Sequence, residues 1–280
     1  MKITLVGVGL IGGSIALKLK KKGVVSYVYG VDKNENHLEE AKNLGIIDEI
    51  STLENAIENS DLIILAIPVD AARKVLPKIL DLVTENHSVM DVGSTKNRIV
   101  NAVENHPNRS RFVAFHPMWG TENSGPKSAK SDSFSGKAAV ICDKEFSAKN
   151  ALKTVEKVAE NLGMHVIYMK AEDHDIHTAY ISHISHITSY ALANTVLEKE
   201  REEDTIFQLA SSGFSSTVRL AKSHPEMWVP IFKQNKENVL DVLNEHISQL
   251  RKFKSALEKD NDELLEELIR NANKIRGILK

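Results

Sequence analysis

Short apolar runs alternate with longer stretches of three-to-four periodicity through the first 170 residues of this chain. A short apolar run between turn residues is typical of a buried strand, and three-to-four spacing is typical of an amphipathic helix. The predicted strands are Ile3–Val6, Tyr27–Val31, Leu62–Ile67, Ser88–Val92, Arg111–Phe115, Ala138–Cys142 and His165–Met169. The predicted helices are Ile11–Lys22, a polar helix ending near Leu44, Val69–Val83 with a break or kink at Pro77, Lys96–Val103 and Ala148–Leu162. This alternation predicts a doubly wound α/β domain over residues 1–170.

The pattern changes after residue 170, where no further strand is predicted. Apolar positions recur at helical spacing through Leu240, Leu243, Ile247 and Leu250, and again through Leu257, Leu264, Leu265 and Leu268. The sequence therefore predicts a second, all-α domain over residues 171–280, with no separate regulatory domain after it.

Composition narrows the function classes. The formal net charge of the 280 residues is −2, so the protein as a whole does not attract nucleic acid or an anionic membrane electrostatically. No apolar run approaches the roughly 20 residues of a transmembrane helix, and no signal-peptide core is visible, so we expect a cytoplasmic protein. The single cysteine, Cys142, excludes an intramolecular disulfide and a cysteine-based zinc cluster.

A glycine-rich turn follows the first predicted strand. Gly7 permits a tight turn, Gly9 lets the backbone approach a pyrophosphate, and Gly12 lets the next helix pack close to the strand. The helix N-terminus, starting around Leu10 and Ile11, then offers free N–H groups to phosphates. Asp32 ends the second strand, 20 residues after Gly12, where a carboxylate can bind a ribose and would repel a 2′-phosphate. These features predict a Rossmann-type domain that binds NAD rather than NADP.

A histidine and a carboxylate, His116 and Glu122, lie on a loop after a later strand of the same predicted sheet. Imidazole titrates near neutrality and can take a proton from a substrate hydroxyl while a hydride leaves for the cofactor. The loop therefore indicates that the dinucleotide takes part in the oxidation of a substrate that carries a hydroxyl group.

A polar stripe marks the start of the helical half. His183 and His186 share one predicted helix face, and three interpretations remain open: a metal site, structural hydrogen-bonded histidines, or substrate recognition in a cleft. No third metal ligand has fitting spacing, and we expect no metal. Arg219 follows among hydroxyl and apolar residues, and its guanidinium suits bidentate capture of a carboxylate.

The combined motifs resemble the prephenate dehydrogenase family of tyrosine biosynthesis over essentially the whole chain. The matching segments are Gly7–Ser14, Asp91–Lys96, His116–Glu122, His174–Asp175, Ser182–His186, Thr217–Arg219 and Met227–Trp228. The resemblance implies that His116 interacts with the substrate ring hydroxyl, that Ser94 supports it, and that His186 and Arg219 hold substrate carboxylates. Glu122 and His183 are further predicted substrate-binding residues.

The implied reaction is the NAD-dependent oxidative decarboxylation of prephenate to 4-hydroxyphenylpyruvate. The resemblance also implies a homodimer formed through residues 171–280. Alternatives are arogenate as the substrate, or another two-domain dehydrogenase such as a β-hydroxyacid dehydrogenase, which would typically use a lysine where this chain offers histidines. A further alternative, from another functional class, is a non-catalytic NAD-sensing protein. That interpretation assigns no function to His116, His186 and Arg219.

Overall fold

The computed structural model describes residues 1–203 and 206–278. The chain forms two compact units, Met1–Asn235 and Lys236–Lys280. None of the described helices is long and apolar enough to cross a membrane.

The first unit is built on one eight-stranded sheet with the order β3-β2-β1-β4-β5-β6-β7-β8. Neighbouring strands are parallel except that β7 runs antiparallel to β6, and β8 follows β7 in parallel. Chain order reverses between β1 and β4, which is the switch point where doubly wound sheets bind their ligands. The strands are β1 (Lys2–Val6), β2 (Tyr27–Val31), β3 (Glu49–Ile50), β4 (Leu62–Leu65), β5 (Ser88–Asp91), β6 (Phe112–Pro117), β7 (Ala138–Cys142) and β8 (His165–Met169).

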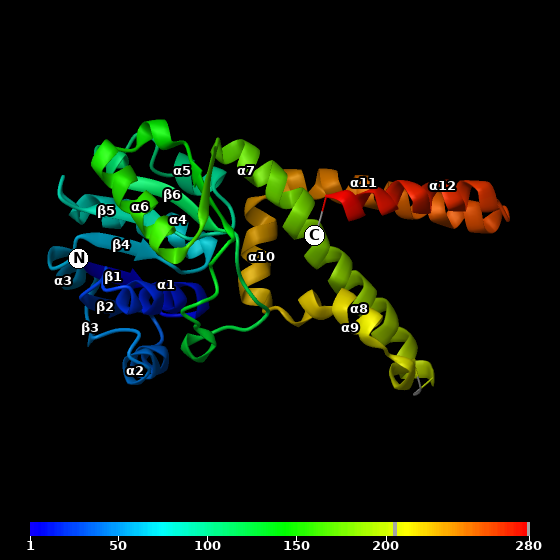
Figure 1. Cartoon of the computed structure of the whole chain (residues 1–280), viewed down its shortest axis with the longest axis horizontal. Coiled ribbons are helices and arrows are strands. Elements are labelled where there is room, and N and C mark those ends of the chain that lie inside the picture. Colours follow the sequence, from blue (N-terminus) through cyan, green and yellow to red (C-terminus); the bar gives the residue numbers. More distant parts are fainter. Residues whose placement is uncertain (204–205, 279–280) are drawn as a thin grey trace. The chain divides into compact units, whose positions relative to one another are not determined.

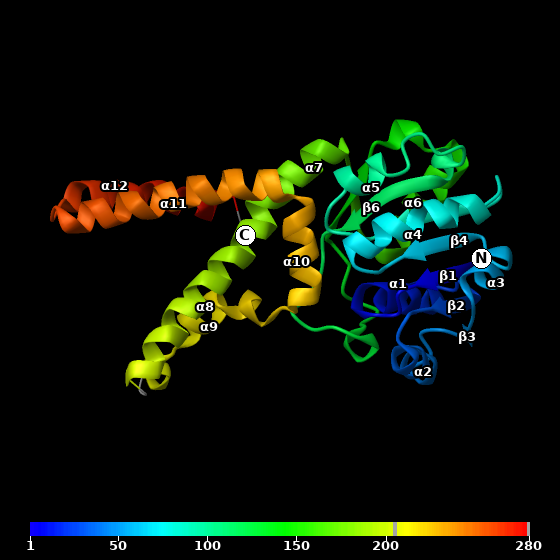
Figure 2. The same ribbon diagram turned by 180° about the vertical axis from the view of Figure 1, so that it is seen from behind.

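Helices cover both faces of this sheet, because alternate side chains of each buried strand point to opposite faces. Ile64 of β4 packs in the core shared with α1, α2 and α6, and the next residue, Leu65, packs in the core shared with α4 and α5. Helix α6 lies in front of the sheet in Figure 1, and α4 lies in front of it in Figure 2. The helices are α1 (Leu10–Lys21), α2 (Glu35–Asn43), α3 (Leu53–Glu58), α4 (Val69–Leu82), α5 (Asn97–Asn101) and α6 (Lys149–Leu162). The predicted doubly wound α/β fold is confirmed.

Strand register brings the predicted motifs to one edge. Val6 of β1 pairs with Val31 of β2 and with Leu65 of β4, which in turn pairs with Asp91 of β5. The residues that follow these four positions therefore emerge side by side at the carboxyl edge of the sheet.

The rest of the first unit is helical, as predicted. A π-helical turn, Ala179–His183, joins α7 (Ala171–Thr178) to α8 (Ile184–Glu203). Helices α9 (Ser212–Thr217) and α10 (Pro225–Gln234) follow, and α10 packs on α4 through Trp228 and Ile231 against Val69. The second unit is a helical hairpin in which α11 (Lys236–Glu258) and α12 (Asp262–Asn273) run side by side (Figure 1). The predicted boundary at residue 170 falls between β8 and α7. The assignment of NAD binding to residues 1–170, and of substrate binding and dimerisation to residues 171–280, stays a prediction.

Three features of the fold differ from the sequence-based expectation. Helix α4 continues through Pro77 without the predicted break, since its buried face, including Leu76 and Ile79, holds it against the sheet. The short elements β3 and α3 were not predicted. The reversal of β7 was also missed, because an apolar run alone does not reveal strand direction.

Candidate active site

The glycine loop has the backbone that close phosphate approach requires. Gly7 has φ of +95°, and a Cβ there would lie 2.3 Å from the carbonyl oxygen of Ala66. A Cβ on Gly12 would lie 2.5 Å from the carbonyl oxygen of Gly7, whereas one on Gly9 would meet nothing within 4 Å. The open space at Gly9 adjoins the start of α1, where Leu10 and Ile11 lie in the first turn and no side chain caps the helix. Free N–H groups beside an open approach fit a pyrophosphate.

Asp32 lies beside this loop, directly after β2. Its Oδ2 accepts a hydrogen bond of 3.1 Å from the backbone N–H of Val8, and its Oδ1 accepts one of 2.9 Å from Asn34. The carboxylate is thereby held against the glycine loop while remaining half-buried. The residues predicted to bind the dinucleotide are brought together at the switch point, and they fit that group.

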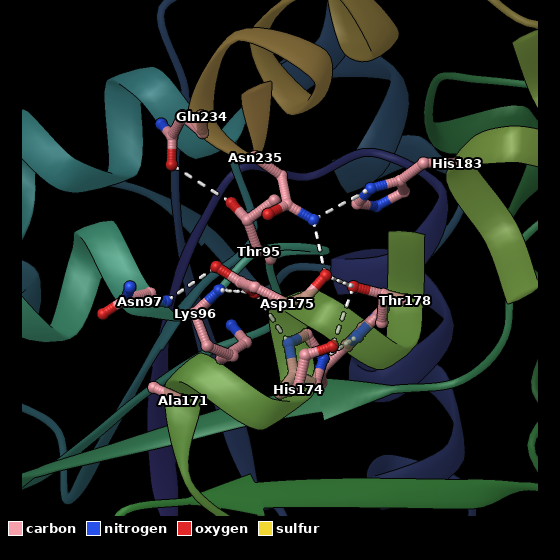
Figure 3. A network of polar contacts seen from close by, with 12 residues as sticks. Thr95, Lys96, Asn97, Ala171, His174, Asp175, Thr178, His183, Gln234 and Asn235 are labelled. Carbon is pink, nitrogen blue, oxygen red and sulfur yellow. Dashed lines mark hydrogen bonds and ion pairs between the residues drawn. The ribbon is translucent and has the colours of Figure 1, made fainter. Parts of the chain in front are cut away.

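His116 occupies the carboxyl end of β6, at the same edge of the sheet. Its Nδ1 lies 2.8 Å from Nε2 of His174 on α7, and Nδ1 of His174 lies 2.9 Å from Oδ1 of Asp175. Backbone N–H groups of Lys96 and Asn97 donate to the two oxygens of Asp175 at 2.7 and 2.9 Å. Figure 3 shows the contacts of Asp175 with Lys96, Asn97 and His174.

The network includes residues that were not predicted as site residues. His174 and Asp175 served only as motif matches in the sequence, although an adjacent imidazole and carboxylate at the start of the helical half is a recognisable signal. Their contacts with His116 and with Lys96 span 58 and 79 residues, and no local pattern indicates such partners.

Burial and nearby charge keep these imidazoles neutral. Loss of hydration lowers the pKa of His116 well below its usual 6.5, and His174 and Lys96 add to the effect. Loss of hydration also lowers the pKa of His174, although Asp175 opposes that shift. A neutral His116 can accept a proton at physiological pH.

A buried ion pair supports the loop between β5 and α5. Lys96 Nζ bonds Asp91 Oδ2, and both side chains are inaccessible to solvent. Asp91 Oδ2 also accepts from Gly93 N–H at 2.9 Å, and Oδ1 accepts from Phe115 N–H at 3.2 Å. This pair ties the loop that carries Ser94 to the strand that carries His116. Ser94 itself is half-buried and makes no hydrogen bond to His116 within the described part of the chain.

His183 lies on the far side of Asp175 from His174. Asn235 Nδ2 donates to the Asp175 carbonyl oxygen at 2.6 Å and to His183 Nδ1 at 3.2 Å (Figure 3). Because Nδ1 accepts, neutral His183 carries its proton on Nε2, and burial lowers the pKa of His183 to about 4. Over residues 1–203 and 206–278, neither His183 Nε2 nor Trp228 Nε1 has a hydrogen-bond partner. Two buried donors are thus left for an acceptor.

His186 lies against the same tryptophan. Its ring stacks on Trp228 with centroids 3.4 Å apart, and its Nδ1 donates to the Ser182 carbonyl oxygen at 3.0 Å. Loss of hydration lowers the pKa of His186, and the positive charge of Arg219 lowers it further. The predicted histidine face therefore carries ring nitrogens that bond within the protein as well as His183 Nε2, which has no partner among the described residues. The π-helical turn within this face was not predicted.

Arg219 and Glu122, both predicted to bind substrate, bond each other. Arg219 Nη1 lies 3.1 Å from Glu122 Oε2, and the arginine side chain is half exposed. The pairing brings the loop after His116 to the helical segment that follows α9.

As for metals, the described ranges contain no group of three or more His, Cys, Asp or Glu side chains arranged to hold an ion.

Comparisons with known proteins identify the family. The model of the prephenate dehydrogenase nucleotide-binding domain matches residues 15–168, and that of the prephenate dehydrogenase dimerization domain matches residues 170–271. The chain belongs to the prephenate dehydrogenase family. The expected nucleotide-binding domain and the resemblance stated from the motifs are both confirmed.

Individual relatives support this assignment over the full length. Prephenate dehydrogenase of Bacillus subtilis is 30% identical across 98% of this chain and 75% of its own. A crystal structure of prephenate dehydrogenase from Aquifex aeolicus, in complex with hydroxyphenyl propionate and NAD+, is 34% identical with a TM-score of 0.89, covering 99% of this chain and 98% of that one. Synechocystis arogenate dehydrogenase is 27% identical with a TM-score of 0.78, and each chain is covered completely. The protein is an oxidoreductase of this family, so the β-hydroxyacid dehydrogenase and the non-catalytic NAD-sensing protein are set aside.

Proposed function

We propose that this prephenate dehydrogenase family member oxidises and decarboxylates prephenate with NAD. The observation that carries the proposal is that neutral His116 and the glycine loop share one edge of the sheet, while the loop after His116 reaches Arg219. A proton acceptor, a nucleotide site and a carboxylate ligand are thus available together.

The dinucleotide site is assigned to Gly7, Gly9, Gly12, the first turn of α1 at Leu10 and Ile11, and Asp32. When bound, NAD supplies the acceptor for the hydride of the hydroxyl-bearing ring carbon. The carboxylate of Asp32, held at the glycine loop by Val8 N–H, favours a ribose hydroxyl over a 2′-phosphate.

His116 acts on the substrate hydroxyl. As the ring carbon loses its hydride, the imidazole of His116 accepts the hydroxyl proton, and Ser94 supports the same oxygen. The resulting dienone loses its ring carboxylate as CO2, because the bond electrons pass into the ring and make it aromatic. The ring oxygen then regains a proton from His116, and 4-hydroxyphenylpyruvate remains.

The two substrate carboxylates require hydrogen-bond donors from the protein. Arg219 offers a planar pair of N–H groups, and the neutral N–H of His183 lacks a partner in a buried position. His186 already uses Nδ1–H on Ser182, so it bonds a carboxylate through a protonated Nε2. A substrate anion opposes the effect of Arg219 and favours that protonation.

Arogenate is the second candidate substrate, and Glu122 is the observation that favours it. Arogenate carries an amino acid side chain in place of the pyruvyl group. A carboxylate next to an arginine suits an α-amino acid, since Glu122 can receive the ammonium while Arg219 receives the carboxylate. Prephenate has no cation for Glu122.

The substrate question has a direct test. We expect absorbance at the NADH band to rise faster with NAD and prephenate than with NAD and arogenate. The variant Glu122→Gln should leave the KM for prephenate unchanged or lower it by about twofold to fivefold, the worth of an exposed ion pair. A higher kcat/KM for arogenate, lost in Glu122→Gln, would assign arogenate instead.

The helical half is assigned to substrate binding and dimerisation, with NAD binding over residues 1–170. Residues 170–271 match a dimerization domain, and Leu250 and Leu257 of α11 are more than half exposed. A homodimer would bury such positions. Light scattering at micromolar concentration should give twice the 31.1 kDa of one chain. A single-chain mass would overturn the dimer.

A further inference from the structure

A continuous line of short contacts runs from the backbone of the β5–α5 loop to His116. The N–H groups of Lys96 and Asn97 hold the Asp175 carboxylate, whose Oδ1 lies 2.9 Å from His174 Nδ1. His174 Nε2 then lies 2.8 Å from His116 Nδ1. His174 and Asp175 are 1% and 2% exposed, so water does not compete for these bonds.

The direction of each bond in this line follows from the carboxylate. Both oxygens of Asp175 accept backbone N–H bonds, and a carboxylate has no proton to donate, so His174 donates to it from Nδ1. Neutral His174 then has a lone pair on Nε2, which accepts the proton carried by His116 Nδ1. His116 is left with an unprotonated Nε2.

The reverse arrangement requires a cation at His174. Both nitrogens of that imidazole would then donate, and His116 would carry its proton on Nε2, where it could not accept another. Burial and the positive charge of Lys96 both oppose an imidazolium at His174, whose pKa is lowered. The neutral arrangement is therefore favoured.

We propose that His174 and Asp175 are positioning residues that hold His116 as its Nδ1–H tautomer and leave Nε2 as the basic nitrogen. The tautomer is a property of the network alone, whereas its use in the reaction rests on the proposed function of His116. The arrangement differs from a carboxylate–imidazole pair acting directly on a nucleophile, because a second imidazole separates the carboxylate from the base.

The same line serves His116 when it is protonated. Once the substrate hydroxyl proton has moved to Nε2, the imidazolium still donates Nδ1–H to His174, and the Asp175 charge lies behind that bond. A hydrogen bond to a charged group is stronger than one to a neutral group. Lys96 limits this stabilisation, so the proton returns readily to the ring oxygen.

Substitutions of His174 separate positioning from simple packing. An asparagine amide reaches about the place of Nδ1 and can still bond Asp175, whereas a glutamine amide reaches the place of Nε2 and can accept from His116. We expect His174→Asn to lower kcat by roughly 10²–10³-fold and His174→Gln by only about tenfold. His177→Gln provides the matched control, since His177 is exposed on the same helix.

The pH profile distinguishes a wrong tautomer from a shifted pKa. A wrong tautomer lowers kcat even on the high-pH plateau, whereas a pKa shift alone disappears there. The dissociation constant for NAD should change little in either variant. Equal losses in His174→Asn and His174→Gln would overturn the positioning role.

Nitrogen NMR of histidine-labelled protein tests the tautomer without catalysis. The signals missing in His116→Asn identify His116 among the 11 histidines. We expect an unprotonated Nε2 and a protonated Nδ1 at pH 7, and a protonated Nε2 would overturn the inference even if both His174 variants folded poorly. Near-normal kcat in His116→Asn would instead remove the proposed base, and the NMR result would still decide the tautomer separately.

Discussion

Arg219 Nη1 and Glu122 Oε2 lie 3.1 Å apart, so two residues predicted to bind substrate bind each other in the structure. The pair joins segments 97 residues apart in sequence. Burial of the two side chains is incomplete, and an exposed pair of this kind contributes little stability. The contact is therefore one that a substrate carboxylate can replace without unfolding the protein.

Replacement of Arg219 should affect substrate binding more than chemistry. A carboxylate is charged in both the ground and transition states, so Arg219→Ala removes uniform binding and should raise the KM for prephenate by about 30–150-fold, with a smaller fall in kcat. Arg219→Lys should restore only part of the loss, because an ammonium lacks the planar fork. Steady-state kinetics with prephenate at saturating NAD measures both constants.

Lys222 offers a matched control on the same exposed turn. Lys222→Ala should change the KM much less than Arg219→Ala. If the ranking is reversed, the carboxylate anchor is Lys222 and Arg219 is a surface charge.

His116→Asn tests the proton acceptor. Loss of a general base should lower kcat by roughly 10²–10⁴-fold, because the hydroxyl proton then has no acceptor as the hydride leaves. NAD affinity, measured by fluorescence titration, should barely change, since the dinucleotide site is assigned to other residues. A variant with near-normal kcat would mean that the loop after β6 is structural.

The parts of the site that follow strands could be predicted from sequence. Parallel strands end at one edge of a sheet, so the placement of Gly7, Asp32 and His116 at that edge follows once the strands are recognised. Their neighbours in the helical half could not be placed in this way. The bond between His174 and His116 depends on how α7 packs on the sheet, and a sequence pattern contains no information on that angle. The pairing of Arg219 with Glu122 was unpredictable for the same reason.

Asp32 should determine the choice of cofactor. Its carboxylate is held at the glycine loop by the N–H groups of Val8 and Asn34, where the 2′-phosphate of NADP would meet a negative charge. We expect a much higher kcat/KM with NAD than with NADP, and a smaller ratio in Asp32→Asn, which keeps an oxygen acceptor without the charge. Equal kcat/KM for the two cofactors in the unmodified protein would remove this role.

The buried histidines should make the folded state sensitive to acid. The pKa values of His116, His174, His183 and His186 are all lowered, chiefly by burial. In the unfolded chain these side chains take up protons as the pH falls below about 6.5, whereas the folded chain keeps them neutral to lower pH. The unfolded state then binds more protons, so the free energy of unfolding is unaffected by these groups above that pH and falls below it.

His183 allows this sign to be measured, because its window extends from 6.5 in the unfolded chain to about 4 in the folded one. Urea unfolding at pH 7, 6 and 5, at one fixed protein concentration, should show stability falling with pH, and more gently in His183→Asn. The exposed His177 gives the control, since His177→Asn should retain the slope of the unmodified protein. If His183→Asn also retains that slope, His183 takes up its proton equally in both states, and its buried N–H is not the neutral donor assigned to it.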